Sequence, residues 1–388
     1  MFNLYQIIVP TLLAFLGTLW IHPRVLKIAI MKDLVDNPNA RKLQRRPIPN
    51  MGGPAVFFGI IIGLCSSQAM SNSTNVFMLM AAMLIMLYIG IMDDISGLTT
   101  SLRFAAEILI ILWLMYVNKA SISCFYELWG INTIPTWISY PLTIFACVGI
   151  INAINLIDGV NGLSSGFCFM ASILFAIIFY HMGNAVMMTL AITAAGAIIP
   201  FFFHNVFGNN TKMFIGDSGT LVYGTIMSVF VISILEKNPV CIGFMHKGMG
   251  LIPFTLAVLS IPVFDTIRVM STRILHKRSP FSPDKTHLHH MFIDLGFSHT
   301  GTTISILTLN FIIIVAWYLS YKLGVSIDVQ LYIVLTLSIC FTFGLYNFTK
   351  RQLAKNGKVL RLLQKISKSI NFEKKGVWAT IEKCIDKL

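Results

Sequence analysis

About eleven stretches, each long and apolar enough to cross a membrane, occupy most of this 388-residue chain. A helix needs about 20 apolar residues to span the hydrocarbon core of a bilayer, because each residue adds only about 1.5 Å to its length. Charged residues make up 12% of the chain, about half the share found in an ordinary soluble protein. The sequence therefore predicts an all-α, polytopic integral membrane protein. The predicted spans cover residues 4–21, 51–69, 75–92, 102–118, 138–154, 166–182, 185–203, 219–235, 249–267, 303–320 and 329–347.

The Lys and Arg residues lie almost entirely in alternate loops between these spans. One set of loops, with the C-terminal segment, holds 25 of the 29 basic residues, and the other holds only Lys119, Lys237, Lys247 and Lys322. Basic loops stay in the cytoplasm, so we expect an N-terminus outside and a C-terminus inside. The net charge of +13 then belongs to one face, where it suits anionic lipid and anionic substrates. Nucleic acid is not required, and we expect none as a partner.

No repeat or soluble domain interrupts the pattern, so we predict one polytopic domain, residues 1–348, and a basic cytoplasmic tail, residues 349–388. The tail carries eleven basic residues and an apolar series at near-helical spacing. This pattern favours a surface helix lying on anionic lipid. A regulatory or partner-binding role is the alternative. The apolar series is Val359, Leu362, Leu363, Ile366 and Ile370.

Four aspartates fall on the side predicted to be cytoplasmic. Asp93 and Asp94 close the third span, and Gly97 is expected to end that helix. Adjacent residues point about 100° apart on a helix, so both can reach one site only near its fraying end. Neighbouring carboxylates repel unless a cation or a proton lies between them, and Mg²⁺ prefers oxygen ligands. The pair is therefore a candidate magnesium site, with a solvated helix end as the alternative.

Asn155, Asp158 and Asn161 recur every three residues and would share one helical face if the segment is helical. An Asn side chain both donates and accepts hydrogen bonds, which suits a nucleobase, a ribose or the ligand shell of a metal. Polar contact between helices is the alternative.

Asp217 directly precedes the eighth span, so it is expected near a helix N-terminus. That end of a helix attracts phosphate through its free N–H groups and its dipole. A simple helix cap is the alternative for this residue.

The segment after the ninth span combines Arg273 with three His residues at 287, 289 and 290. Ser282 is expected to cap a short helix that begins at Pro283 and ends before Gly296. On that helix His287 and His290 would share a face, with His289 pointing elsewhere. No Cys or carboxylate pair completes a zinc site here, so binding of a diphosphate or a sugar beside Arg273 fits better. An apolar stripe is expected at the membrane interface: Leu288, Met291, Phe292 and Leu295.

Two further acidic residues, Glu107 and Asp265, lie in or beside apolar spans. Each has an arginine at helical spacing, Arg103 and Arg268 respectively. Local ion pairs explain both, and we assign neither a catalytic role.

Taken in order, these segments resemble the polyprenyl-phosphate N-acetylhexosamine-1-phosphate transferases. The resemblance covers nearly the whole chain. The sequence His287-Leu288-His289-His290 is similar to the His-x-His-His of the bacterial branch that uses UDP-GlcNAc, whereas the MurNAc-pentapeptide branch typically has three consecutive His. The segments that carry the resemblance are Val35-Asp36 to Arg41-Lys42, Pro49-Asn50-Met51-Gly52-Gly53, Asp93-Asp94, 152–162, 214–219 and 279–292.

The resemblance implies transfer of a sugar 1-phosphate, with GlcNAc-1-phosphate expected, from a UDP-sugar to undecaprenyl phosphate with release of UMP. It implies the first membrane step of cell-envelope polysaccharide synthesis, at a groove on the cytoplasmic face of the bacterial inner membrane. It also implies Mg²⁺, with Mn²⁺ as the substitute. The alternatives are a phospho-MurNAc-pentapeptide or other UDP-N-acetylhexosamine transferase and, in another class, a secondary transporter. The oligomeric state stays open, a homodimer included.

The resemblance also implies roles for individual residues. Metal binding falls to Asp217, Asn155 and Asp94, and catalysis to Asp93, Asp94, Asp158 and His287. Asn161 stands where many bacterial members carry Asp, and an amide there can bind uracil but cannot act as a nucleophile. Substrate binding falls to Lys42, Asn155, Asn161, Arg273, His287, His289 and His290.

Overall fold

A computed structural model describes residues 4–36, 47–71, 74–237, 239–281, 285–355, 357–370 and 376–387. Within them lie two two-stranded antiparallel ribbons, β1 (Val35–Asp36) with β2 (Ile48–Pro49) and β3 (Cys124–Leu128) with β4 (Ile131–Thr133). The rest of the architecture is helical. In chain order the helices are α1 (Leu4–Met31), α2 (Gly52–Cys65), α3 (Gln68–Ser71), α4 (Thr74–Ser96), α5 (Thr100–Asn118), α6 (Thr136–Leu156), α7 (Leu163–Met182), α8 (Ala185–Phe207), α9 (Gly216–Leu235), α10 (Pro239–His246), α11 (Leu251–Val258), α12 (Ser260–Leu275), α13 (Leu288–Asp294), α14 (His299–Lys322), α15 (Ile327–Ile339), the π-helical turn η1 (Cys340–Gly344), α16 (Leu345–Lys355), α17 (Lys358–Ser369) and α18 (Val377–Ile385).

The all-α polytopic class is confirmed. Among the described residues, nine helices are long and apolar enough to cross a membrane, or ten if α11 and α12 count as one span. The remaining predicted span, 51–69, is a shorter apolar helix of 14 residues, because the polar run Ser66-Ser67-Gln68 follows its end at Cys65. All eleven predicted spans therefore correspond to helices, although one is short and one is bent.

The bend between α11 and α12 measures 74° and is stabilised from a neighbouring helix. The Asn310 side chain of α14 accepts hydrogen bonds from Ser260 Oγ and the Ile261 N–H, both at 2.9 Å. Its amide nitrogen donates to the Val258 carbonyl at 3.0 Å. One side chain thus satisfies backbone groups on both sides of the break, which a helix bent inside a membrane requires.

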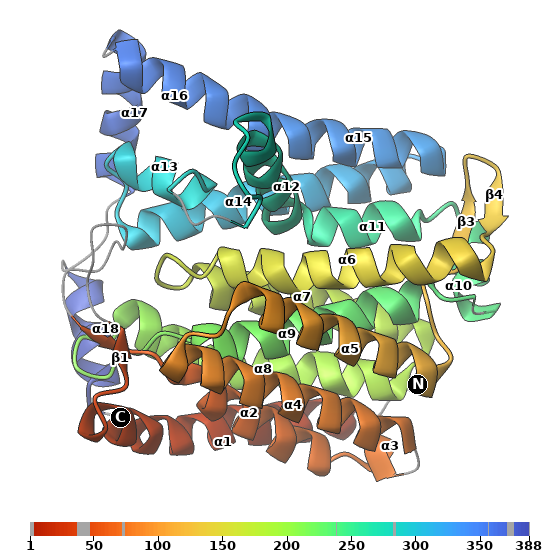
Figure 1. Cartoon of the computed structure of the whole chain (residues 1–388), viewed down its shortest axis with the longest axis horizontal. Coiled ribbons are helices and arrows are strands. Elements are labelled where there is room, and N and C mark those ends of the chain that lie inside the picture. The colour runs from red at the N-terminus through yellow and green to blue at the C-terminus, as the bar shows by residue number, and fades with distance from the viewer. Residues whose placement is uncertain are drawn as a thin grey trace.

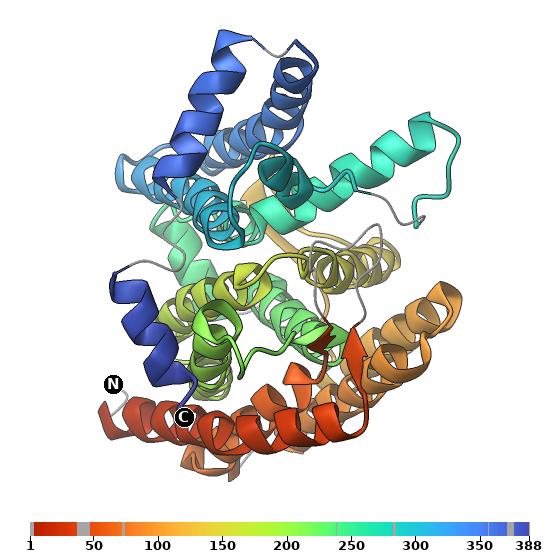
Figure 2. The same ribbon diagram turned by 90° about the vertical axis from the view of Figure 1, so that its left-hand side faces the viewer.

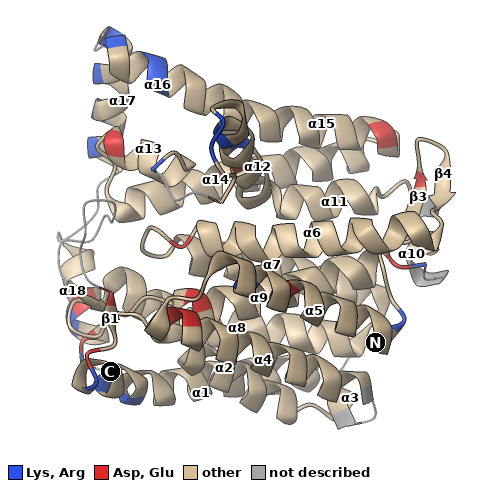
Figure 3. Cartoon of the chain, viewed as in Figure 1, with Lys and Arg blue, Asp and Glu red and all other residues tan. Residues whose placement is uncertain are grey.

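The long helices run side by side, and the marked ends of the chain lie at opposite ends of the bundle (Figure 1). We call the end that carries β1, α13, α17 and α18 the basic end, and it faces the viewer in Figure 2. The other end carries β3, β4 and α10. Lys and Arg gather mainly at the basic end (Figure 3), so the loops with most of the basic residues do lie on one side of the molecule.

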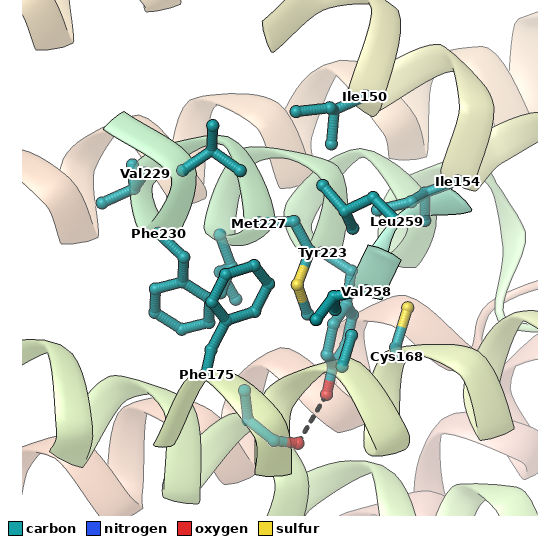
Figure 4. Packing of buried hydrophobic residues seen from close by; sticks show 14 of the residues in the cluster. Ile150, Ile154, Cys168, Phe175, Tyr223, Met227, Val229, Phe230, Val258 and Leu259 are labelled. Atoms are coloured by element: carbon teal, nitrogen blue, oxygen red, sulfur yellow. Dashed lines mark hydrogen bonds between the residues drawn. The ribbon is translucent and has the colours of Figure 1, made fainter. Parts of the chain in front are cut away.

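Helix α9 forms the centre of the core and is covered almost completely by its neighbours. Phe175 of α7 packs against Phe230 of α9 with ring centroids 5.2 Å apart, and the Tyr223 hydroxyl donates to the Ala194 carbonyl at 2.7 Å (Figure 4). At the start of α9, a Cβ on Gly90 of α4 would lie 2.6 Å from the carbonyl carbon of Asp217. Backbone therefore packs on backbone where α4 meets the first turn of α9.

The tail is helical and folds back on the basic end. The Asp386 carboxylate, just after α18, accepts hydrogen bonds from the backbone N–H groups of Asn209, Asn210 and Thr211 at 3.0, 3.1 and 3.3 Å. The Trp378 ring also lies 4.4 Å from that of Phe207 at the end of α8. The tail thus holds the turn that leads from α8 to the start of α9.

Candidate active site

Asp93 and Asp94 lie at the C-terminal end of α4, which stops at Ser96 before Gly97 with φ +66°. As predicted, both lie at the end of their helix, and their side chains have different partners. Asp93 accepts from the Leu98 N–H at 2.7 Å and pairs with the Arg103 guanidinium at 3.2 Å. Asp94 turns instead toward the beginning of α9.

The Asp94 carboxylate closes the N-terminus of α9 from a different helix. It accepts from the N–H groups of Asp217 and Ser218 at 2.9 and 3.0 Å and from the Asn50 amide at 2.8 Å. Two of the free N–H groups that were expected to attract phosphate are therefore already paired inside the protein. The cap of α9 is Asp94 and not Asp217.

Asp217 lies in the first turn of α9, where it meets the end of α6. The Asn155 amide nitrogen donates to the Asp217 carboxylate and, at 2.8 Å, to Thr220 Oγ1. The negative charges of Asp93 and Asp94 both lie close enough to repel that of Asp217. The structure thus brings three carboxylates together, an arrangement that a divalent cation would stabilise.

The segment after α6 corrects the predicted helical face. The helix ends at Leu156 and residues 157–162 form turns, so Asn155, Asp158 and Asn161 do not share a face. Gly162, with φ +78°, adopts a left-handed conformation that a continuing helix does not allow. Asn161 lies against α14, where its backbone carbonyl accepts a hydrogen bond from Thr303 Oγ1 at 2.8 Å.

The Asp158 carboxyl accepts from Ser164 Oγ at 2.5 Å. Burial raises the pKa of Asp158 to about 7, whereas an unfolded Asp titrates near about 3.9. Between these values the folded protein holds a proton that the unfolded chain releases, so a rise in pH from about 4 to about 7 weakens folding.

We therefore expect the thermal midpoint of Asp158→Asn to exceed that of the wild type by a margin that grows with pH and levels off above about pH 7. The Asn side chain keeps an acceptor for Ser164 but cannot ionise. Thermal unfolding in detergent at pH 5, 6, 7 and 8 measures the margin. A margin that stays constant over this range would show that the Asp158 carboxyl does not titrate there.

The His segment also differs from its prediction. Residues 285–287 are not helical and α13 begins at Leu288, while the expected cap at Ser282 and Pro283 lies outside the described residues. The rings of His287 and His289 stack with centroids 5.7 Å apart, and the His290 ring lies 4.4 Å from that of His289. The apolar stripe of α13 is buried against the protein and is not at a membrane interface, because α14 and α16 cover it.

A buried carboxylate orients His287. Asp265 accepts from His287 Nδ1 at 3.0 Å and from the Leu288 N–H at 3.1 Å, and it pairs with Arg268 at 2.6 Å. The side chains of these three charged or titratable residues are almost completely buried. Among the described residues, His287 Nε2 has no hydrogen-bond partner. That nitrogen is a candidate contact for substrate.

The His289 side chain of α13 packs against Gly159, in the loop that carries Asp158. A Cβ on Gly159 would lie 2.5 Å from His289 Nε2, so only glycine allows this approach. Burial lowers the pKa of His289 well below its usual value. At neutral pH this imidazole is uncharged, and it can offer a hydrogen bond but no positive charge.

Arg273 lies in the last turn of α12, buried, with its guanidinium donating to the Pro280 carbonyl at 2.6 Å. Beside this loop is a cavity of about 440 Å³, between the start of α5 and residues 279–281. Its lining includes Phe104, which meets Phe281 edge-on at 4.6 Å. Lys42 lies outside the described residues, so its predicted role is untested.

Sequence reasoning missed several residues of this region. Asn50, Thr220 and Asp265 contact Asp94, Asn155 and His287 respectively, across 44, 65 and 22 positions of the sequence. No local pattern marks such long-range contacts. The predicted pairs Arg103–Glu107 and Arg268–Asp265 are confirmed at 3.7 and 2.6 Å, but Asp265 has the further contact with His287.

The region is consistent with a magnesium ion that shares its ligands with substrate. In the described part of the chain, no three His, Cys, Asp or Glu side chains are arranged to hold a metal ion by themselves. Mg²⁺ commonly uses one or two carboxylates, several waters and substrate phosphates. Asp217, repelled by two neighbouring carboxylates, fits that pattern.

Comparison with known proteins covers the same part of the chain. The profile of glycosyl transferase family 4 matches residues 76–235, which contain Asp93, Asp94, Asn155, Asp158 and Asp217. A Bacillus subtilis (strain 168) protein, "Probable undecaprenyl-phosphate N-acetylglucosaminyl 1-phosphate transferase", is 30% identical over 80% of this chain and 84% of its own length.

Two other relatives come from other bacteria. The "Undecaprenyl-phosphate alpha-N-acetylglucosaminyl 1-phosphate transferase" of Salmonella typhi is 29% identical over 70% of this chain and 72% of its own length. The "Decaprenyl-phosphate N-acetylglucosaminephosphotransferase" of Mycolicibacterium smegmatis is 29% identical over 74% of both. The chain therefore belongs to the polyprenyl-phosphate N-acetylhexosamine-1-phosphate transferases of glycosyl transferase family 4.

Proposed function

We propose that the protein transfers GlcNAc-1-phosphate from UDP-GlcNAc to undecaprenyl phosphate and releases UMP. The observation that carries this proposal is the meeting of Asp93, Asp94 and Asp217 at the basic end, beside Asn155. The names of the relatives specify the same donor group and a polyprenyl-phosphate acceptor.

In the proposed reaction a phosphate oxygen of the lipid attacks the phosphorus that bears the sugar. The bond between the two phosphates of the donor breaks, and UMP leaves with the bridging oxygen. The acceptor is a phosphate monoester whose second pKa is about 6, so it is mostly ionised at neutral pH and needs little help from a base. The main barrier is the repulsion between two anions, which positioning and charge neutralisation reduce.

Named side chains supply the parts of this mechanism. Asp217 and Asn155 would hold Mg²⁺ (or Mn²⁺), and the ion would neutralise charge on the donor diphosphate. Asp94 keeps the first turn of α9 in place, and Asp93 is the candidate to orient the acceptor or take its last proton. His287, Arg273 and His289 would contact sugar or phosphate, the last as an uncharged hydrogen-bond donor.

We place the basic end in the cytoplasm of a bacterium, at the inner membrane. Basic loops remain on that side during insertion, and the nucleotide donor is made there. The lipid phosphate can then meet a soluble nucleotide while its hydrocarbon chain stays in the bilayer. Asp93, Asp94 and Asp217 lie at helix ends, and Lys and Arg gather mainly toward the basic end (Figure 3), which favours an interfacial enzyme over a transporter.

The test uses purified protein with undecaprenyl phosphate, Mg²⁺ and a panel of UDP-sugars, scored by UMP release and by the lipid product. We expect UMP release only with lipid and cation present, and fastest with UDP-GlcNAc. Preference for UDP-MurNAc-pentapeptide or for another N-acetylhexosamine would reassign the donor. Uptake of a solute by proteoliposomes without UMP release would contradict the enzyme assignment.

A further inference from the structure

Helix α17 crosses the basic end of the molecule at its rim. In Figure 1 it runs crosswise to the spans, and in Figure 2 it is seen lengthwise while many of the spans are seen close to end-on. A helix with this orientation at the end of a membrane-spanning bundle lies parallel to the bilayer surface. Helix α16, which continues the last span, leads directly toward it.

One side of α17 is fixed to the protein. Leu360 and Ser367 are only 4% and 2% exposed. The Ser367 hydroxyl lies 3.6 Å from the position of a Cβ on Gly296, in the turn after α13. Packing therefore sets the rotation of the helix about its own axis. The sequence then determines which residues lie on its outward faces.

The outward faces separate apolar from basic side chains. Val359, Leu362 and Ile366 are 41%, 58% and 43% exposed, and their spacing of three and four places them on one stripe. The basic residues occupy the adjoining flank at the same helical spacing, and all are exposed: Lys358, Arg361, Lys365 and Lys368. α17 contains no acidic residue.

We propose that α17 binds the anionic surface of the bilayer that holds the spans. Val359, Leu362 and Ile366 enter the boundary between headgroups and acyl chains, and the four basic residues contact lipid phosphates. Three aliphatic side chains offer far less than the area of about 1,000 Å² that a specific protein partner usually covers. A one-sided set of four cations matches a negatively charged leaflet.

The test places a fluorophore on α17 in the full-length protein. The described chain has three exposed cysteines, Cys65, Cys340 and Cys384, and replacing them by Ser leaves only buried thiols. Leu362→Cys is then labelled with an environment-sensitive dye, and Lys365→Cys, on the basic flank, is the matched control. Both are reconstituted in nanodiscs of phosphatidylcholine with or without phosphatidylglycerol.

We expect the dye at position 362 to be blue-shifted and quenched by doxyl-labelled lipid in the anionic nanodiscs, and the dye at 365, at the level of the headgroups, to be quenched less. Arg361→Gln combined with Lys368→Gln is expected to reduce the quenching at 362 several-fold, as is 0.5 M salt, which screens at about 4 Å. Hydrogen exchange of residues 358–369 provides a label-free check. Equal quenching in neutral and anionic nanodiscs would overturn the charge-based recognition, and a dye at 362 that stays in water would overturn membrane binding. Because no readout uses catalysis, failure here leaves the proposed reaction untouched.

Discussion

Asp217→Asn is expected to reduce UMP release by at least about a hundred-fold, a loss comparable to removing one charge-stabilising group from an active site. The amide preserves the shape of the side chain, and its oxygen can still accept a hydrogen bond from the Asn155 amide nitrogen. It removes the negative charge that would hold Mg²⁺ against the donor diphosphate. Turnover at saturating substrates, followed by titration with Mg²⁺, measures the effect.

The same substitution should leave the protein folded. It removes a carboxylate that Asp93 and Asp94 repel, so the thermal midpoint without cation should not fall. Asp33→Asn is the matched control, because Asp33 is exposed near the basic end and its φ of +53° suits Asn. Wild-type turnover in Asp217→Asn would remove this residue as a cation ligand.

Gly90→Ala is expected to prevent stable folding or to displace the start of α9. The new methyl group would lie 2.6 Å from the Asp217 carbonyl carbon and closer still to the backbone of Ser218. Backbone atoms in a buried helix cannot rotate away as a side chain can, so α4 and α9 must separate. Overpacking of this kind costs typically about 1–3 kcal/mol, and here it also pulls Asp94 away from the N–H groups that it caps.

Thermal unfolding in detergent and UMP release measure this second prediction. Gly149→Ala is the control, since Gly149 also lies inside a spanning helix but no atom would lie within 4 Å of its Cβ. We expect that control to be neutral or slightly stabilising, because Ala is the better helix former. Equal stability of the two variants would show that α4 and α9 do not pack as closely as the structure indicates.

The features that could be predicted from the sequence depend on local signals. Hydropathy located the spans, Gly97 marked the end of α4, and the distribution of Lys and Arg predicted which loops share a side. Asp217 was placed correctly near the start of a helix because a Gly and a long apolar run flank it. The hydropathy and helix-end signals each lie within a window of about 20 residues, and the charge distribution needs only the composition of each loop.

The features that could not be predicted arise from contacts between distant segments. The predicted continuation of α6 through Asp158 is wrong. Glycines and tertiary contacts in this segment favour turns over a helix. The orientation of His287 is set by Asp265 of α12, and the bend before α12 is stabilised by Asn310 of α14. The catalytic and binding roles of these residues remain predictions, whereas their proximity is a property of the fold.

The docking of α18 has a practical consequence for expression and purification. The Asp386 carboxylate accepts hydrogen bonds from three backbone N–H groups of the turn that leads toward Asp217. An affinity tag or fluorescent protein fused just after Asp386 would therefore crowd that turn. The N-terminal helix α1 begins at the opposite end of the bundle (Figure 1). Fusion partners therefore belong at the N-terminus, and proteolytic clipping before α18 should be checked in any inactive preparation.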